Sequence, residues 1–244
     1  MRRLGEFKYN SVLALVNEVV MDRSAAPTIE ATVNDRSVEN PWVLETIGWG
    51  GVMLDIGCHG SEYLPEMAAR ANRAYGLDIE QVPHVDGVQM VRGDVMNPPL
   101  KPRSFDVIVS ISAIEHIGCD FYGQIPSEDA DMTAMQQIRE LLRDDGRLLI
   151  SVPYGRGATH AWFRVYDAYR LRRLLHGFRP LSIRYYRRNG NRYERCMAEE
   201  IADAGFDLAG FRSDGLVLAE LAKGPLTQTL SPLETGCARA GGRG

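Results

Sequence analysis

The sequence has few cysteines, no long hydrophobic run and no excess of one charge. Its four cysteines are scattered and form no CxxC spacing, which argues against a zinc site and a disulfide scaffold. The 28 basic and 32 acidic residues give a net charge of -4, so charge does not favour nucleic acid or an anionic membrane as a partner. No run is long enough to cross a bilayer. We therefore expect a soluble, cytoplasmic protein.

The chain has no Pro-, Gly- or Ser-rich linker, which favours one domain. The segment SVLALVNEVV includes an asparagine and a glutamate, so it predicts an amphipathic helix at about Tyr9–Met21 and not a signal peptide. We expect residues 1–40 to hold this helix and a polar connector, residues 41–224 to form the folded domain, and residues 225–244 to be a disordered tail.

Short apolar segments alternate with helix-like segments or loops, which is the pattern of an α/β fold. Strands of this kind are covered on both faces by helices. The expected strands are Val52–Ile56, Ala74–Leu77, Val88–Val91, Phe105–Ser110 and Arg147–Val152. Helical periodicity predicts one helix in DMTAMQQIRELLRDDG and another at Asp167–His176. The late segments PLSIRYYRRNG and GLVLAELAK predict two strands that form an antiparallel edge on a mostly parallel sheet.

A glycine turn follows the first expected strand, in VMLDIGCHGSEY. The strand ends near Asp55 and breaks at Gly57 before a helix. Backbone N–H groups and a helix N-terminus would then face the carboxyl edge of the sheet, where such folds bind ligands. A tight connection without a ligand is the alternative, because glycine turns are common.

Further acidic and polar residues end the next strands. Asp78 follows the second strand, where a carboxylate can accept both hydroxyls of a ribose. Asp94 follows the third strand, and the segment Ser110–His116 follows the fourth. Each acid alone could be a solvated loop residue or a helix cap. Together they favour a nucleoside site.

The identity of the nucleoside follows from the charge of the turn. The spacing of Gly57 and Gly60 does not fit the Gly-x-Gly-x-x-Gly pattern of dinucleotide folds, and Asp55 would repel a pyrophosphate. A carboxylate suits a cationic cofactor instead. S-adenosylmethionine has an ammonium and a sulfonium, a ribose that Asp78 would bind, and an adenine amino group that Asp94 could bind.

The segments VMLDIGCHGS, AYGLDIE, VRGDV, SFDVIVSISAIEHIG and LLRDDGRLLISVP resemble the successive motifs of class I S-adenosylmethionine-dependent methyltransferases, over about Trp42 to Pro153. VENPWVL, IEHIGCDFYG and RVYD are similar to a bacterial subgroup found with saccharide and secondary-metabolite biosynthesis. The resemblance implies a Rossmann-like, seven-stranded, mostly parallel sheet with helices on both faces and an antiparallel C-terminal hairpin.

The resemblance also implies which residues bind the cofactor. Asp55 and Gly57 would frame the methionine end, Asp78 the ribose and Asp94 the adenine. The remaining residues expected at the cofactor are Cys58, His59, Gly60, Ile79, Val95 and Ser110. The turn departs from the family pattern Asp-x-Gly-x-Gly-x-Gly, because a histidine and a serine replace the second and third glycines. We expect Gly60 to supply the backbone flexibility.

Methyl transfer mainly requires an aligned nucleophile, and a base is optional. His116, with Glu115 beside it, is the predicted catalytic base for a hydroxyl acceptor, because it leaves the fourth strand near the expected methyl group. The alternative is that both residues only shape the loop or cap a helix. A further segment, GRGATHAWFRVYD, predicts a lid that binds a flat or sugar-like acceptor, or else an ordinary loop. Its expected acceptor-binding residues are His160, Trp162, Arg164 and Tyr166.

The arginine- and tyrosine-rich segment RPLSIRYYRRNGNRYER could bind a phosphorylated acceptor or RNA, but a solvated hairpin face is the favoured interpretation. We expect a methyltransferase that acts on oxygen of a small polar acceptor, such as a sugar or a secondary-metabolite intermediate. Alternatives are an N- or RNA methyltransferase, a non-catalytic S-adenosylmethionine-binding module and a nicotinamide oxidoreductase. Neither a metal nor a membrane is expected to take part, and a homo-oligomer stays open.

Overall fold

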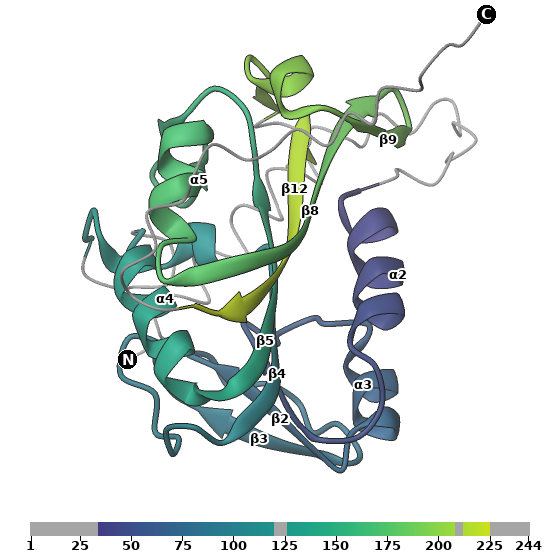
Figure 1. Ribbon diagram of the computed structural model, residues 1–244, viewed down its shortest axis with the longest axis vertical. Helices are drawn as coiled ribbons and strands as arrows, with labels where there is room; N and C mark the ends of the chain where they lie inside the picture. Colours follow the sequence, from purple (N-terminus) through teal and green to yellow (C-terminus); the bar gives the residue numbers. More distant parts are fainter. Residues whose placement is uncertain (1–33, 120–125, 208–211, 225–244) are drawn as a thin grey trace, which may run out of the picture.

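The computed structural model describes residues 34–119, 126–207 and 212–224. They contain an eight-stranded sheet with the order β3-β2-β1-β4-β5-β12-β8-β9 (Figure 1). Neighbouring strands from β3 to β5 are parallel, whereas β12 is antiparallel to both β5 and β8, and β9 is antiparallel to β8. The strands are β1 Val52–Ile56, β2 Arg73–Asp78, β3 Val88–Arg92, β4 Phe105–Ile111, β5 Leu142–Pro153, β8 Phe178–Asn189, β9 Arg192–Cys196 and β12 Gly215–Lys223.

The predicted α/β class and the antiparallel C-terminal part of the sheet are confirmed. The sheet has eight strands and not seven, because Arg192–Cys196 folds back on β8 and adds an edge strand. Two short strand pairs lie outside the main sheet. They are β6 Ala158–Thr159 with β7 Arg164–Val165, and β10 Phe206–Asp207 with β11 Arg212–Ser213.

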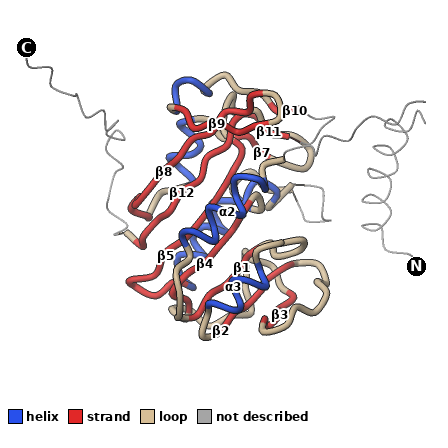
Figure 2. Tube along the Cα trace, turned by 90° about the vertical axis from the view of Figure 1, so that its right-hand side faces the viewer, coloured by secondary structure: helices blue, strands red, loops and turns tan. Residues whose placement is uncertain are grey.

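Helices cover both faces of the sheet, with α2 and α3 on one face and α4 and α5 on the other (Figures 1 and 2). Their bounds are α2 Arg36–Thr46, α3 Leu64–Arg70, α4 Ala130–Leu141 and α5 Ala168–Leu174, and two 3-10 turns occur at Ile114–His116 and Ala198–Ile201. Helix α2 begins inside the expected polar connector, since its buried face of Glu39, Trp42 and Val43 holds it on the sheet. The predicted helix at Tyr9–Met21 and the tail at 225–244 lie outside the described residues.

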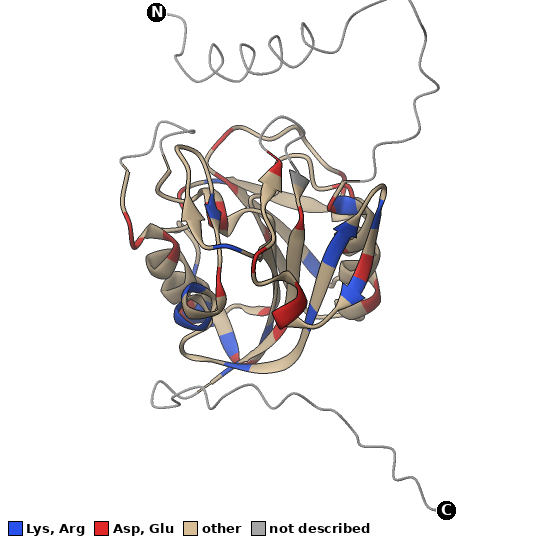
Figure 3. Cartoon of the chain, turned by 90° about the horizontal axis from the view of Figure 1, so that it is seen from above, with Lys and Arg blue, Asp and Glu red and all other residues tan. Residues whose placement is uncertain are grey.

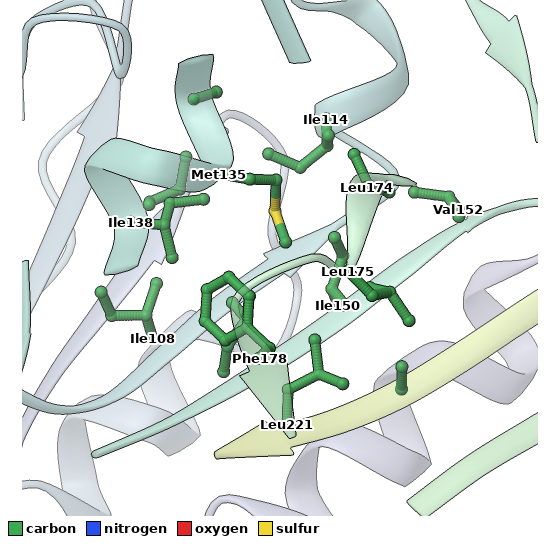
Figure 4. Close-up of a cluster of buried hydrophobic side chains, with 14 of the residues drawn as sticks. Ile108, Ile114, Met135, Ile138, Ile150, Val152, Leu174, Leu175, Phe178 and Leu221 are labelled. Atoms are coloured by element: carbon green, nitrogen blue, oxygen red, sulfur yellow. The ribbon is translucent and has the colours of Figure 1, made fainter. Parts of the chain in front are cut away.

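Alternating side chains of the strands build a core on each face. In β1, Val52 and Leu54 pack toward α4 and α5, whereas Met53 packs toward α2 and α3. Figure 4 shows part of the first core, where Phe178 and Leu221 meet side chains of α4 and the central strands. Burying each such side chain contributes about 1.5–3 kcal/mol, so the two cores hold the carboxyl ends of the parallel strands in fixed positions.

The described surface carries both signs of charge (Figure 3). On the arginine-rich hairpin, Arg188 pairs with Asp214, and Arg187 lies opposite Glu194 in the strand register. This pairing favours the solvated-face interpretation of the hairpin over a nucleic-acid surface. None of the helices in the described ranges is long and apolar enough to span a membrane.

Candidate active site

A cavity of about 210 Å³ lies at the carboxyl ends of the parallel strands. The predicted cofactor residues that line it are Gly57, His59, Asp78, Ile79, Asp94 and Val95. They come from three separate segments at the ends of β1, β2 and β3, and the parallel register of these strands brings the segments to one edge of the sheet. The remaining wall includes Arg36, Ser112, Ala113, His116 and Ile117. The predicted nucleoside position therefore corresponds to a formed cavity.

The glycine turn keeps the backbone close to the opposite wall of this cavity. Gly57 has a φ of +74°, and a Cβ there would lie 2.5 Å from the Cβ of Ala113. Gly60 has a φ of +80°, whereas His59 does not adopt a positive φ. The expectation that Gly60 supplies the backbone flexibility is confirmed, and His59 keeps ordinary backbone angles.

Two carboxylates on the cavity wall are held by backbone donors. Asp78 Oδ2 accepts the His59 N–H at 3.0 Å, and its Oδ1 accepts the Glu80 N–H at 2.9 Å. Asp94 Oδ1 accepts the Met96 N–H at 2.9 Å. Each carboxylate oxygen has a second lone pair, so both side chains can accept hydrogen bonds from a ligand without reorienting.

The other predicted cofactor residues do not line the cavity. Asp55, Cys58 and Ser110 are buried behind it, and Gly60 is exposed in the turn. Asp55 Oδ1 accepts the Tyr63 hydroxyl at 2.8 Å, whereas its Oδ2 has no hydrogen-bond partner among the described residues. Burial raises the pKa of Asp55 to about 7. Cys58 Sγ packs against Gly76 of β2, so its side chain belongs to the core.

A second cavity of about 200 Å³ adjoins the first. The two cavities share Arg36, Ser112 and His116 on their walls. The second cavity is also lined by Asn34, Asp35, Glu115, Pro153, Trp162, Phe163 and Phe206. A group bound in one cavity can therefore meet a group bound in the other beside His116.

The protonation state of His116 follows from its contacts. Its Nδ1 lies 2.6 Å from the Trp162 carbonyl oxygen, which can only accept, so Nδ1 carries the proton and Nε2 the lone pair. Burial lowers the pKa of His116 to about 4, so the ring is neutral at pH 7. Its Nε2 lies 4.0 Å from Glu115 Oε1. Glu115 is buried, which raises its pKa to about 8, and its Oε2 has no hydrogen-bond partner among the described residues.

Comparison with known proteins identifies the fold. A crystal structure of 1,6-didemethyltoxoflavin-N1-methyltransferase from Burkholderia thailandensis, with bound S-adenosylhomocysteine, superposes with a TM-score of 0.54 at 20% identity, over 92% of each chain. The cyclase SpnF superposes with a TM-score of 0.57 at 14% identity, over 91% of this chain and 95% of its own. The chain has the class I S-adenosylmethionine-dependent methyltransferase fold.

Two sequence matches accompany this methyltransferase fold. Residues 95–203 match the family described as "Caenorhabditis protein of unknown function, DUF268". A protein of Encephalitozoon cuniculi that is provisionally named a methyltransferase is 28% identical over 118 residues, which are 48% of this chain. The matched part spans 50% of the length of that relative.

Four residues were predicted to bind an acceptor, and one of them, Trp162, lines the second cavity. His160 stacks on Phe163 at 4.5 Å but lines neither cavity. Arg164 and Tyr166 are buried in the core and also line neither.

The contacts of these two residues are internal. Arg164 donates to the carbonyl oxygens of Ile117 at 2.5 Å and Ser127 at 2.7 Å, and the Tyr166 hydroxyl donates to Asp131 at 2.9 Å. In this structure Arg164 fixes the backbone that follows the 3-10 turn bearing His116. These internal contacts explain the burial of Arg164 without an acceptor.

Sequence reasoning missed a buried network that shapes the junction of the two cavities. Glu39 of α2 is fully buried, and its Oε1 accepts the hydroxyls of Ser112 at 2.7 Å and Ser151 at 2.6 Å. Its Oε2 accepts from Arg36 at 2.9 Å. The network fixes α2 to the ends of β4 and β5 and holds Ser112 at a φ of +46°. The segment VENPWVL, which includes Glu39, resembles a motif of the methyltransferase subgroup, but the sequence alone indicated no role for the glutamate.

Among the described residues, no group of three or more His, Cys, Asp or Glu side chains could hold a metal ion.

Proposed function

We propose that the protein is an S-adenosylmethionine-dependent methyltransferase that methylates an oxygen of a small polar acceptor. The observation that supports this most directly is the shared position of His116 on both cavities. One cavity has the carboxylates that suit a cationic nucleoside. The other lies next to the place where the methyl group would be and contains aromatic and acidic side chains.

The first cavity fits the proposed cofactor in its donor and acceptor chemistry. Asp78 would accept the ribose hydroxyls, Asp94 the adenine amino group, and the turn from Gly57 to His59 would cover the methionine end. The unpartnered buried Oδ2 of Asp55 adds negative potential beneath this turn when Asp55 is ionised. When bound, S-adenosylmethionine supplies a methyl carbon that its sulfonium has already activated.

The residues of the chain would then align the acceptor and remove its proton. His116 Nε2 accepts the hydroxyl proton while the acceptor oxygen attacks, and the Trp162 carbonyl holds the imidazole in the required tautomer. Alignment and exclusion of water by the cavity walls can account for up to about 7–11 kcal/mol of the barrier.

The nature of the acceptor is a separate proposal. Resemblance to the bacterial subgroup supports a saccharide or secondary-metabolite intermediate, in a cytoplasmic setting. The Burkholderia relative is an N1-methyltransferase by name, which keeps methylation of nitrogen as an alternative. SpnF is named a cyclase, so this fold also occurs in a protein named for another reaction. RNA as acceptor is disfavoured by the mixed charge of the hairpin and the small cavity volume.

The test is calorimetric binding of S-adenosylhomocysteine, followed by an assay of its release from S-adenosylmethionine across sugars, phenols, amines and RNA. We expect Asp78→Ala to weaken binding by about 10- to 150-fold, since hydrogen bonds to a charged group contribute about 1.5–3 kcal/mol. Asp86→Ala is the matched control, because that side chain is exposed and lies outside both cavities. Equal affinity of wild type and Asp78→Ala would disprove the cofactor site, and binding without turnover of any acceptor would favour the non-catalytic module.

A further inference from the structure

The two cavities share one permanent cation on their walls. Among the described residues that line them, Arg36 is the only arginine or lysine. Its side chain is 39% exposed, so part of it stays open to a ligand. A guanidinium is charged throughout the physiological pH range. The first cavity, whose wall carries the acidic Asp78 and Asp94, therefore also has a fixed positive site.

One edge of the Arg36 guanidinium has no partner within the protein. Nη1 donates to Glu39 Oε2 at 2.9 Å and to the Ile111 carbonyl oxygen at 3.2 Å. The side chain makes no other hydrogen bond within the described residues. Nε–H and the neighbouring N–H of Nη2 form the edge that remains. Two parallel donors of this kind match the two oxygens of a carboxylate.

Glu39 fixes the orientation of this edge before a ligand binds. Glu39 is fully buried, and its Oε1 accepts the hydroxyls of Ser112 and Ser151. The carboxylate that holds Arg36 cannot turn away without breaking these two hydrogen bonds. An arginine held in this way loses little conformational entropy when it binds an anion.

Arg36 also lies where the tail of the proposed cofactor would end. The strand order β3-β2-β1-β4 places Asp94, Asp78 and the turn at Gly57 in succession along the edge of the sheet. These residues are the ones proposed for the adenine, the ribose and the methionine end. Arg36 comes next in this succession, because it is bound to Ile111, the last residue of β4.

S-adenosylmethionine has a carboxylate at the end of its methionine chain. We propose that Nε and Nη2 of Arg36 bind this carboxylate, and that Arg36 makes the site select nucleosides with an intact amino-acid tail over decarboxylated ones. This inference rests on the proposed function. An anionic group on an acceptor in the second cavity could use the same edge. The cofactor is favoured, because its carboxylate is present with every acceptor, whereas the aromatic and acidic wall of the second cavity gives no reason for an anionic acceptor.

The test compares S-adenosylhomocysteine by calorimetry with its decarboxylated analogue, in which an aminopropyl chain replaces the amino-acid tail. Both have the same adenine, ribose, thioether and amine, so the ratio of their affinities measures the carboxylate. Wild type is expected to bind S-adenosylhomocysteine about 10- to 150-fold more tightly, the effect of hydrogen bonds to a charged group. Equal affinities would overturn the inference and leave the cofactor site intact, whereas no binding of either nucleoside would refute both.

Variants assign the ratio to Arg36. Arg36→Leu should bring it to about one, through loss of affinity for S-adenosylhomocysteine. Arg36→Lys should keep only part of it, because an ammonium has the charge but no planar fork. Arg73→Leu is the matched control, because Arg73 is exposed at the start of β2 and lines neither cavity. Since Arg36→Leu leaves the buried Glu39 without its cation, the double variant Arg36→Leu/Glu39→Gln is also measured and should give the same ratio.

Two further probes separate the two sources of a bound anion. Para-hydroxybenzoate and phenol are titrated with saturating S-adenosylhomocysteine, and Arg36→Leu should change the nucleoside ratio more strongly than the ratio of these two. The inference is overturned if Arg36→Leu and the double variant retain the wild-type nucleoside ratio. It is also overturned if Arg36→Leu changes only the ratio of hydroxybenzoate to phenol, which would assign Arg36 to an anionic acceptor.

Discussion

The imidazole of His116 is held by Trp162 in two ways. Its Nδ1–H donates to the Trp162 carbonyl at 2.6 Å, and the two rings stack with centroids 5.4 Å apart and planes 11° from parallel. The contact joins the 3-10 turn after β4 to the segment between β6 and β7, which are far apart in the sequence. It fixes both the tautomer and the orientation of the ring, which is the arrangement that the proposed role of His116 as a base requires.

Substitution of His116 should slow turnover without weakening the cofactor. For a hydroxyl acceptor found in the assay of sugars and phenols, His116→Gln is expected to lower kcat by about 10²- to 10⁴-fold, because no base then accepts the hydroxyl proton. Since the pKa of His116 is lowered to about 4, wild-type turnover should not fall with pH on its account until about pH 5. S-adenosylhomocysteine release measures both effects, with the exposed His84→Gln as control. Full turnover of His116→Gln would exclude a base at this position.

Two glycines of the cofactor turn should respond differently to the same substitution. Gly57 and Gly60 both have positive φ, which costs a residue with a side chain about 1–2 kcal/mol. A Cβ added at Gly57 would also lie 2.5 Å from the Ala113 Cβ, which is a steric clash, whereas a Cβ added at Gly60 would meet nothing within 4 Å. Gly57→Ala should therefore lose more unfolding free energy and more S-adenosylhomocysteine affinity than Gly60→Ala. Denaturant titration and calorimetry measure the two losses, and equal losses would contradict this description of the turn.

Local patterns were enough to predict the sheet edge. The strands before Asp55, Asp78 and Asp94 were recognisable as short apolar runs, and parallel pairing necessarily brings their carboxyl ends together. The pattern could not separate a residue on the cavity wall from one behind it. Asp55 lies one residue before the end of β1 and Asp78 ends β2, but only Asp78 lines the cavity. The difference depends on how the turn after each strand packs.

Side chains whose partners are distant in the sequence could not be predicted. Arg164 was expected at the acceptor because it lies in an aromatic segment whose composition suits a lid, but backbone carbonyls more than 30 residues away enclose it. Glu39 is joined to Ser112 and Ser151 across more than 70 residues. Phe206 reaches the second cavity from the C-terminal part of the chain. No periodicity or spacing in a single sequence records such contacts.

The buried Glu39 should contribute strongly to stability. Glu39→Leu removes the acceptor of Arg36, Ser112 and Ser151, and breaking a buried ionic network by removing one partner costs about 3–5 kcal/mol. Glu45→Leu on the same helix is the matched control, because Glu45 is exposed. Chemical denaturation gives the two unfolding free energies. A loss below 1 kcal/mol for Glu39→Leu would show that Arg36 and the serines find other partners.

Stability should fall as the pH rises from about 6.5 to 8. Burial raises the pKa of Glu115 from 4.5 to about 8 and that of Asp55 from 3.8 to about 7, so the folded state holds more protons than the unfolded state in this window. His116 has the opposite effect, because its pKa is lowered from 6.5 to about 4, but only about 0.4 kcal/mol of that effect remains above pH 6.5. The expected net loss of unfolding free energy is on the order of 1–2 kcal/mol.

Glu115→Gln tests the source of this pH dependence. The amide does not ionise, so the variant should lose most of the slope between pH 7 and 8 and be more stable than wild type at pH 8. Glu140→Gln should keep the wild-type slope, because its side chain is 61% exposed. Denaturant titrations at pH 6.5, 7.25 and 8 measure the slopes. An unchanged slope in Glu115→Gln would mean that the Glu115 carboxyl is already ionised in the folded state, which would also require a cation or a donor beside its Oε2.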